Sequence, residues 1–196
     1  NIIIGRFQDQ DLRVIDAPCM GRCASAPVLE IGHFHVENAN LEKVSEAIEK
    51  KWKSPIIPNY QSFEDYVNKG GYQKFMEIKV REDIWYDNII KADLRGLGGA
   101  GFRTAKKWEL VSKQKGLKYL AVNGDEGEPG TFKDKHYLEK EPHMFLEGML
   151  MAATYIKAEK CFIYIRDEYP AVLEILKNEI TKLEKEKIVP LNYIDM

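Results

Sequence analysis

Apolar positions recur with two different periods along the chain, and these periods predict both helices and strands. Residues 28–36 alternate apolar with small or polar side chains around Gly32, as a pair of short strands does. One face of a helix is predicted over 41–52 by Leu41, Val44, Ala47, Ile48 and Trp52. Short apolar runs at 2–4 and 12–15 precede these elements. The first fifty residues therefore predict a small α/β unit.

The pattern after residue 61 predicts a larger α/β layer structure. Helices are expected at 62–69, 83–92, 105–115, 142–156 and 169–185, and strands at 117–122 and 161–165. The first of these helices has a capping pattern of Ser62 and Asp65 and is followed by Gly70 and Gly71. Because strands and helices alternate, we expect a largely parallel sheet.

The two parts are separated by a break that contains Pro55 and Pro58. We assign residues 1–53 to a partial small module, 54–61 to a linker and 62–196 to the larger α/β domain. The chain begins without Met and stops at Met196, directly after an apolar segment. We therefore expect a fragment of a longer protein, with the larger domain truncated at its C-terminal side.

Composition and charge narrow the class of protein. The chain is 44% hydrophobic and 31% charged, which is typical of a globular protein. A net charge of -2 argues against a nucleic-acid binder that neutralises phosphates. No apolar run reaches membrane-spanning length, and no basic stretch leads into an apolar one at the N-terminus. Three cysteines, an odd number, favour a reducing compartment. We expect a cytoplasmic protein without direct membrane insertion.

The first candidate site is the glycine loop, Gly96-Leu97-Gly98-Gly99-Ala100-Gly101. It formally matches the G-x-G-x-x-G dinucleotide fingerprint, which requires a strand directly before the loop. Because a helix is predicted there instead, we reject an ordinary Rossmann assignment. The glycines still allow a ligand to approach the backbone closely, and the helix that begins near Thr104 adds its positive end. The loop indicates a phosphate or ring site, with a flexible surface turn as the alternative.

The second candidate is the acidic turn, Asn123-Gly124-Asp125-Glu126-Gly127-Glu128-Pro129-Gly130, which follows an apolar strand. Ligands of open α/β sheets bind beyond the carboxyl ends of the strands. The Asn123 amide can both donate to and accept from a heterocycle, and the carboxylates can accept hydrogen bonds from ribityl or ribose hydroxyls. A solvated turn is the alternative. The spacing of a Ca²⁺-binding EF-hand loop is absent.

Together the two segments resemble the FMN- and NADH-binding flavoprotein subunit of respiratory complex I. The resemblance extends from the glycine loop and Phe102 through Lys107-Trp108, the acidic turn with Thr131-Phe132-Lys133-Asp134, Pro142-His143, Glu147-Gly148-Met149 and Tyr164-Ile165-Arg166. It looks closer still to the beta subunit of soluble NAD-dependent formate dehydrogenase, and it is similar to the diaphorase subunit of NAD-reducing hydrogenase. It implies a small thioredoxin-like N-terminal module followed by a truncated, Rossmann-like complex I flavoprotein FMN-binding domain.

The resemblance also implies cofactors and site residues. FMN would contact Gly96, Gly98, Gly99, Lys107, Asn123, Asp125, Glu126 and Gly127. NAD(H) would contact Phe102 and Glu128. The implied reaction is hydride transfer between NAD(H) and FMN, with single electrons passing to or from iron–sulfur clusters and no catalytic side chain. A [4Fe–4S] cluster is expected in the missing C-terminal part.

The implied partners are an iron–sulfur thioredoxin-like subunit and a catalytic subunit of the molybdenum type. Formate dehydrogenase is the favoured enzyme. The flavoprotein subunit of complex I, the hydrogenase diaphorase subunit and a non-catalytic assembly or electron-transfer scaffold stay open as alternatives.

The segment Cys19-Met20-Gly21-Arg22-Cys23 resembles the second ligand pair of the thioredoxin-like [2Fe–2S] subunit of complex I. Such a cluster needs four ligands, and Cys161 lies in a predicted buried strand. We favour a vestigial docking module over a [2Fe–2S] cluster at Cys19 and Cys23. His33 and His35 share a strand face without an evident third ligand.

Overall fold

The computed structural model describes residues 13–97 and 99–196, with the backbone alone at 82–85. The apolar run at 2–4, Leu12 and Gly98 lie outside the described residues. The predicted run at 12–15 forms no regular element in its described part, residues 13–15.

The described part of the N-terminal unit, from residue 13 on, contains a short 3-10 helix, a hairpin and one α-helix. These are η1 (Cys23–Ser25), β1 (Leu29–Ile31), β2 (Phe34–Val36) and α2 (Leu41–Glu49). β1 and β2 pair antiparallel around Gly32, whose positive φ of 63° suits a glycine at the turn. Asn40 caps α2 by accepting a 2.9 Å hydrogen bond from the Lys43 N–H. The predicted hairpin and helix are confirmed, whereas the thioredoxin-like assignment of residues 1–53 stays a prediction.

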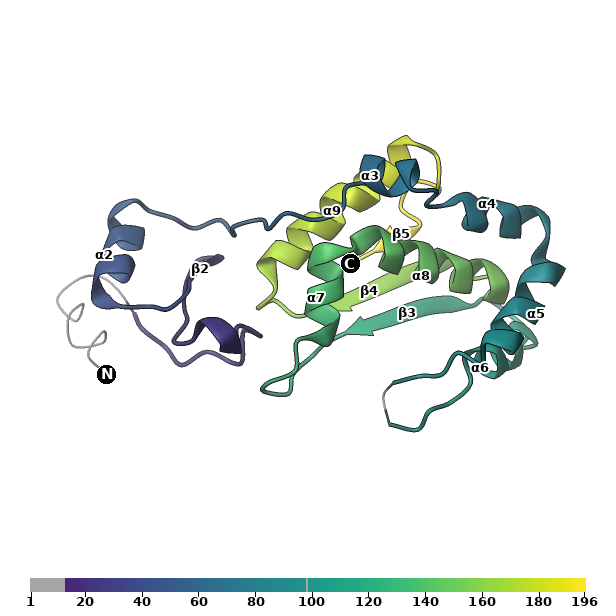
Figure 1. Ribbon diagram of the computed structural model, residues 1–196, viewed down its shortest axis with the longest axis horizontal. Coiled ribbons are helices and arrows are strands. Elements are labelled where there is room, and N and C mark those ends of the chain that lie inside the picture. The colour runs from purple at the N-terminus through teal and green to yellow at the C-terminus, as the bar shows by residue number, and fades with distance from the viewer. Residues whose placement is uncertain (1–12, 98) are drawn as a thin grey trace.

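The larger part is built on a parallel sheet in the order β3-β4-β5. Its strands are β3 (Tyr119–Gly124), β4 (Lys160–Ile165) and β5 (Ile194–Asp195). The helices α7 (Lys133–Lys140) and α8 (Pro142–Ile156) connect β3 to β4, and α9 (Pro170–Lys185) connects β4 to β5. Figure 1 shows α8 and α9 along the sheet, as expected of parallel crossover connections. The predicted mixed α/β fold with a parallel sheet is confirmed.

The core lies on one face of this sheet. Cys161 and Ile163 of β4 are buried together with apolar residues of α8 and α9, including Leu146, Leu150, Val172, Leu176 and Leu183. The alternate β4 residues Phe162 and Tyr164 are exposed, as is Tyr119 of β3. One face of the sheet is therefore open at these aromatic side chains, although parallel sheets are usually covered on both faces.

Between the predicted linker and the sheet lie the helices α3 (Phe63–Asn68), α4 (Gln73–Val80), α5 (Glu82–Ala92) and α6 (Thr104–Ser112). Ser62 caps α3 by accepting a 3.1 Å hydrogen bond from the Asp65 N–H, as its sequence pattern predicts. Tyr155 of α8 stacks on Tyr86 of α5 at 5.1 Å between ring centroids. No helix of the described residues is long and apolar enough to cross a membrane.

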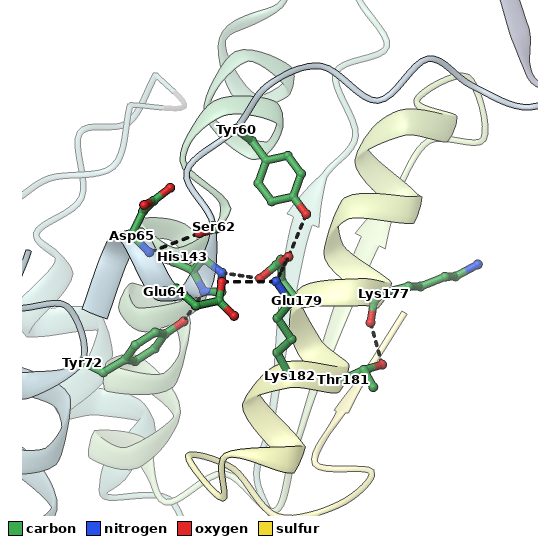
Figure 2. A network of polar contacts seen from close by, with 10 residues as sticks. All are labelled: Tyr60, Ser62, Glu64, Asp65, Tyr72, His143, Lys177, Glu179, Thr181 and Lys182. Atoms are coloured by element: carbon green, nitrogen blue, oxygen red, sulfur yellow. Dashed lines mark hydrogen bonds and ion pairs between the residues drawn. The ribbon is translucent and has the colours of Figure 1, made fainter. Parts of the chain in front are cut away.

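A buried polar network ties the segment around α3 to α8 and α9 (Figure 2). His143 Nε2 lies 2.7 Å from a Glu179 carboxylate oxygen, and both side chains are fully buried. The Tyr72 hydroxyl lies 2.8 Å from His143 Nδ1, and the Tyr60 hydroxyl donates to Glu179 at 2.7 Å. The two tyrosine bonds join segments more than seventy residues apart in sequence.

The charge state of the network follows from its burial and its hydrogen bonds. Burial lowers the pKa of His143, and the bond to Glu179 opposes this only in part. Burial raises the pKa of Glu179, but hydrogen bonds from Tyr60, His143 and Lys182 outweigh it and leave that pKa lowered. A neutral imidazole therefore donates from Nε2 to an ionised carboxylate and accepts the Tyr72 hydroxyl at Nδ1. This network is structural.

Candidate functional site

The glycine loop connects α5 to α6 as an exposed hairpin. The Gly96 N–H donates to the Phe102 carbonyl at 2.9 Å, and the Thr104 N–H donates to the Leu94 carbonyl at 2.8 Å. These two bonds fix the base of the loop directly before α6. The prediction that a helix precedes the loop is confirmed, so the ordinary dinucleotide fingerprint is absent.

Two arginines at the base of the loop converge on Asp93. Arg95 and Arg103 face each other in an antiparallel bridge, and each lies 2.9 Å from a carboxylate oxygen of Asp93. The hydrogen bond from Arg95 is the main reason why the pKa of Asp93 is lowered. Arg95 also donates to the Gly101 carbonyl at 3.3 Å. The arginine side chains thus hold the loop base and face Asp93.

The described part of the loop tip is open. Gly99 and Gly101 have φ values of +99° and +58°, which residues with a side chain rarely adopt. A Cβ added to either residue would meet no atom within 4 Å. Phe102, directly after the loop, and Lys107 of the following helix are both exposed. The tip therefore leaves room for a flat or phosphate-bearing ligand close to the backbone.

The acidic turn leaves the carboxyl end of β3 in a fixed conformation. Asn123 Oδ1 accepts a 3.0 Å hydrogen bond from the Asp125 N–H, which is an Asx turn. Gly124 packs closely against β4, because a Cβ there would lie 2.6 Å from Ile165 Cδ1. A larger residue at position 124 would displace the end of the Ile165 side chain and crowd the Tyr164 carbonyl where the turn begins.

Glu126 is buried and caps α7. Its carboxylate oxygens accept the backbone N–H groups of Asp134 at 2.8 Å and Lys135 at 3.0 Å. A carboxylate at this end of a helix also interacts favourably with the helix dipole. The predicted contact between Glu126 and FMN stays a prediction, and this side chain is already engaged in holding the turn against α7.

Arg166 supports the turn from the other side, and sequence reasoning did not assign it a site role. Directly after β4, its Nη1 donates a 2.5 Å hydrogen bond to the Glu126 carbonyl. Its Nε donates to Glu168 at 3.1 Å and lies 3.6 Å from an Asp125 oxygen. The sequence signal that could have identified Arg166 was its place in the Tyr164-Ile165-Arg166 motif. This motif ends the strand parallel to β3, and ligands bind beyond the carboxyl ends of such strands.

The side chains that remain exposed at this edge define the candidate surface. Register pairs Asn123 with Tyr164, and both are exposed on the open face of the sheet. Asp125 and Glu128 are also exposed, and Gly127 lies between them. Figure 1 shows the acidic turn and the glycine loop both on the β3 side of the sheet, away from α9. In the described part of the chain, no hydrogen bond or ion pair joins these two segments.

The chain has three cysteines, one fewer than the four ligands of a [2Fe–2S] cluster. Cys19 is half-buried and Cys23 is exposed, whereas Cys161 is fully buried in β4. Burial raises the pKa of the Cys161 thiol to about 11, so it stays protonated and acts in packing. The described residues contain no group of three or more His, Cys, Asp or Glu side chains that could hold a metal ion. A [2Fe–2S] cluster at Cys19 and Cys23 thus stays untested.

A parallel α/β sheet with a glycine loop and an ordered turn beyond a strand end is an arrangement found in domains that bind flavins or nucleotides. The Nuo51 FMN-binding domain family matches residues 89–195, which include both segments and more than half of the chain. The chain belongs to this family. Its residues fit FMN, because the loop offers open backbone and the turn offers fixed polar groups.

Proteins of similar sequence agree with this family. An NADH-quinone oxidoreductase subunit of Aquifex aeolicus (strain VF5) is 40% identical over 140 residues, which are 70% of this chain and 32% of the relative. The mitochondrial 51 kDa subunit of NADH-ubiquinone oxidoreductase of Neurospora crassa is 38% identical over 129 residues, 63% of this chain and 26% of the relative. The chain thus spans about a third of the length of the curated relatives it matches.

A solved structure resembles more of the chain. The crystal structure of NAD⁺-reducing [NiFe]-hydrogenase in the air-oxidized state matches with a TM-score of 0.74 and 25% sequence identity. The match covers 98% of this chain and 38% of the hydrogenase chain. This likeness therefore includes the N-terminal unit, which lies outside the residues matched by the FMN-binding family.

Proposed function

We propose that this chain is the flavin-binding part of a subunit of an NAD-linked oxidoreductase. FMN binds at the glycine loop and the acidic turn, and NAD(H) binds over the flavin. The observation that carries this proposal is the coincidence of an open, glycine-lined backbone with a turn that is fixed by Glu126 and Arg166. Bound FMN would supply the redox chemistry, exchanging a hydride with NAD(H) and single electrons with iron–sulfur clusters.

The glycine loop serves the phosphate and ring side of FMN in this proposal. Backbone groups at Gly96 and Gly99, together with Gly98 outside the described residues, would face the cofactor. The N-terminus of α6 favours negative charge, and Lys107 in its first turn is exposed and cationic. A phosphate supplies the anion that this helix end lacks, because its first turn contains no acidic residue.

The acidic turn serves the polar edge of the flavin and the nicotinamide. Asn123, Asp125 and Gly127 would bind FMN, with Glu126 holding the turn in place through α7. Phe102 and Glu128 would contact NAD(H), and both side chains are exposed and able to meet a second ligand. The protein itself thus binds and orients the reactants.

The finer assignment is the beta subunit of an NAD-dependent formate dehydrogenase. This assignment implies two partners, an iron–sulfur thioredoxin-like subunit and a molybdenum-type catalytic subunit. It also implies a [4Fe–4S] cluster in another part of the beta subunit. The likeness to the hydrogenase covers 98% of this chain, whereas the likeness to the Aquifex complex I subunit covers 70%. Because the likeness to the hydrogenase includes the N-terminal unit, it supports an enzyme in which such a unit is fused to the flavin domain. The hydrogenase diaphorase subunit remains the alternative that the same observation favours.

The test begins with the absorption spectrum of the purified chain after incubation with FMN and removal of free flavin. The proposal expects bound flavin that NADH bleaches without oxygen. A colourless protein contradicts the FMN site and favours a non-catalytic scaffold. Bound flavin that NADH leaves oxidised contradicts the NAD(H) part alone. A matched titration with NADPH measures how selective that second site is.

A further inference from the structure

The acidic turn is held from two sides, and one loop of the N-terminal unit contacts α7 directly and reaches Arg166 through Tyr169. The supports are Arg166, which bonds the Glu126 carbonyl, and α7, whose first amides bond the Glu126 carboxylate. The loop is residues 19–23, which we call the cysteine loop. Figure 1 shows this loop near the end of the sheet where the acidic turn leaves β3.

The first contact joins Gly21 to Tyr169. Gly21 is buried with φ +61°, and a Cβ added there would lie 2.8 Å from the Tyr169 hydroxyl oxygen. Tyr169 is 1% exposed, and the Arg166 guanidinium lies over its ring at 5.5 Å from the centroid. No hydrogen bond of normal geometry to a described residue holds the Tyr169 hydroxyl, and Gly21 lies close against this ring, whose face meets Arg166.

The second contact joins Arg22 to α7. Arg22 is anchored in its own unit by Glu37 at 2.6 Å, and its Nη2 lies 3.5 Å from Glu139 of α7. Glu139 is buried and also pairs with Lys135 at 3.2 Å. Lys135 supplies one of the two N–H groups that the Glu126 carboxylate accepts. Arg22 therefore contacts the last turn of α7, and the Glu139–Lys135 ion pair links that turn to the first turn, which anchors the acidic turn.

We propose that Gly21 and Arg22 are positioning residues that order the acidic turn for FMN. The inference rests on the proposed function of that turn. A turn that contains three carboxylates and three glycines is costly to order, and ordering it before binding spares FMN that cost. The N-terminal unit thus sets FMN affinity through Tyr169 with Arg166 and through Glu139 with α7, without touching the cofactor.

The test compares Gly21→Ala and Arg22→Gln with two controls. Gly116→Ala reproduces the positive φ, since Gly116 has φ +91° with nothing within 4 Å of an added Cβ. Arg13→Gln removes an exposed arginine from the same N-terminal unit. Hydrogen–deuterium exchange without cofactor follows the amides of 123–135, and quenching of flavin fluorescence gives the FMN dissociation constant. Circular dichroism identifies any variant that fails to fold.

We expect faster exchange at the Asp134 and Lys135 amides in both variants, and an FMN dissociation constant raised about tenfold. The controls match the wild type. Unchanged exchange in a folded Arg22→Gln variant overturns the inference, even if Gly21→Ala fails to fold. Faster exchange in a chain whose wild type binds no FMN supports the positioning contact and contradicts the proposed function. Faster exchange with unchanged FMN affinity overturns the link to the cofactor.

Discussion

Arg166 Nη1 donates a 2.5 Å hydrogen bond to the carbonyl oxygen of Glu126, forty residues earlier in the chain. The Arg166 side chain is only 7% exposed, and carboxylates of Asp125 and Glu168 lie on its Nε side. Its charge is therefore balanced by one carboxylate of the acidic turn and by one that follows β4, and its bond to the Glu126 carbonyl holds the turn in place.

Replacing Arg166 by Met keeps the apolar stem but removes the donors and the charge. We expect a loss of about 1–3 kcal/mol of unfolding free energy, because the buried Glu126 carbonyl loses its donor. FMN affinity should fall by more than about tenfold. Urea unfolding and flavin titration measure the two effects. Arg166→Lys keeps the charge but not the planar set of guanidinium donors, so we expect losses of stability and FMN affinity between those of the wild type and Arg166→Met. An Arg166→Met variant with the stability and FMN affinity of the wild type would show that Arg166 does not support the acidic turn.

Replacing Glu126 by Ala removes the cap of α7. The expected loss is about 1–2 kcal/mol in urea unfolding, the usual value of a helix cap. Glu126→Gln keeps one acceptor oxygen and should lose less. Glu128→Ala is the matched control, since Glu128 is an exposed carboxylate of the same turn. Equal stability of the Ala variants at 126 and 128 would contradict the capping role.

Removing the Tyr72 hydroxyl tests the network of Figure 2 without emptying the core. Tyr72→Phe leaves His143 Nδ1 without its buried donor, so we expect the free energy of unfolding to fall by about 1 kcal/mol. The loss is larger if no water molecule reaches the unpaired nitrogen. Tyr137→Phe is the control, because Tyr137 is about half exposed on α7. Urea midpoints measure both variants. A Tyr72→Phe protein as stable as the control would contradict the network.

The N-terminal unit should lose stability in mild acid. Burial, followed by the nearby charge of Arg22, lowers the pKa of His35 from 6.5 to about 4. Between these two pH values the unfolded chain binds a proton at His35 and the folded chain does not. The stability that neutral His35 gives the folded state is therefore complete above about pH 6.5 and is lost as the pH falls toward 4. The charged or titratable groups around it are Arg22, Glu30, His33, Glu37 and Lys135.

His35→Asn isolates this titration from the other acid-sensitive groups, His143 included. Urea unfolding at several pH values between 4 and 7 should show a steeper loss in the wild type than in the variant. The difference between the two curves should lie within that window. Parallel curves would mean that His35 titrates in the folded protein as it does in the unfolded chain.

Glu128→Ala should separate the two ligands. Glu128 is exposed on the acidic turn and bonds none of the supports described above, so we expect FMN binding to be kept. The concentration of NADH needed for half-maximal bleaching of the flavin should rise. Rapid mixing under anaerobic conditions measures it. Loss of FMN from this variant would instead place Glu128 in the flavin site.

How far the sequence predicted the fold depended on local signals. Helix α8 was predicted to the residue because its apolar pattern is long and Pro142 marks its start. Helix α4 was missed because its N-cap, Tyr72, lies in the left-handed region without a side-chain cap bond. Strand β5 has two residues and is defined only by pairing with β4, which no local pattern reveals.

The candidate site shows the same limit. The glycine loop and the acidic turn were visible in the sequence because composition and spacing are local. The support by Arg166 depends on a bond that spans forty residues, and the cap by Glu126 depends on α7, whose charged sequence carries no usual cap residue at its N-terminus. The contact of Gly21 with Tyr169 depends equally on the tertiary fold.

The most direct test of the account is a titration of FMN fluorescence with the purified chain and two glycine variants. Gly99 and Gly116 both have positive φ, and an added Cβ meets nothing at either, so Gly99→Val and Gly116→Val carry matched strain. We predict saturable one-to-one quenching by the wild type and by Gly116→Val, and affinity lowered by more than about tenfold in Gly99→Val, whose side chain would occupy the cofactor's place. No saturable quenching by the wild type, or equal affinity in the two variants, would contradict a flavin site at the glycine loop.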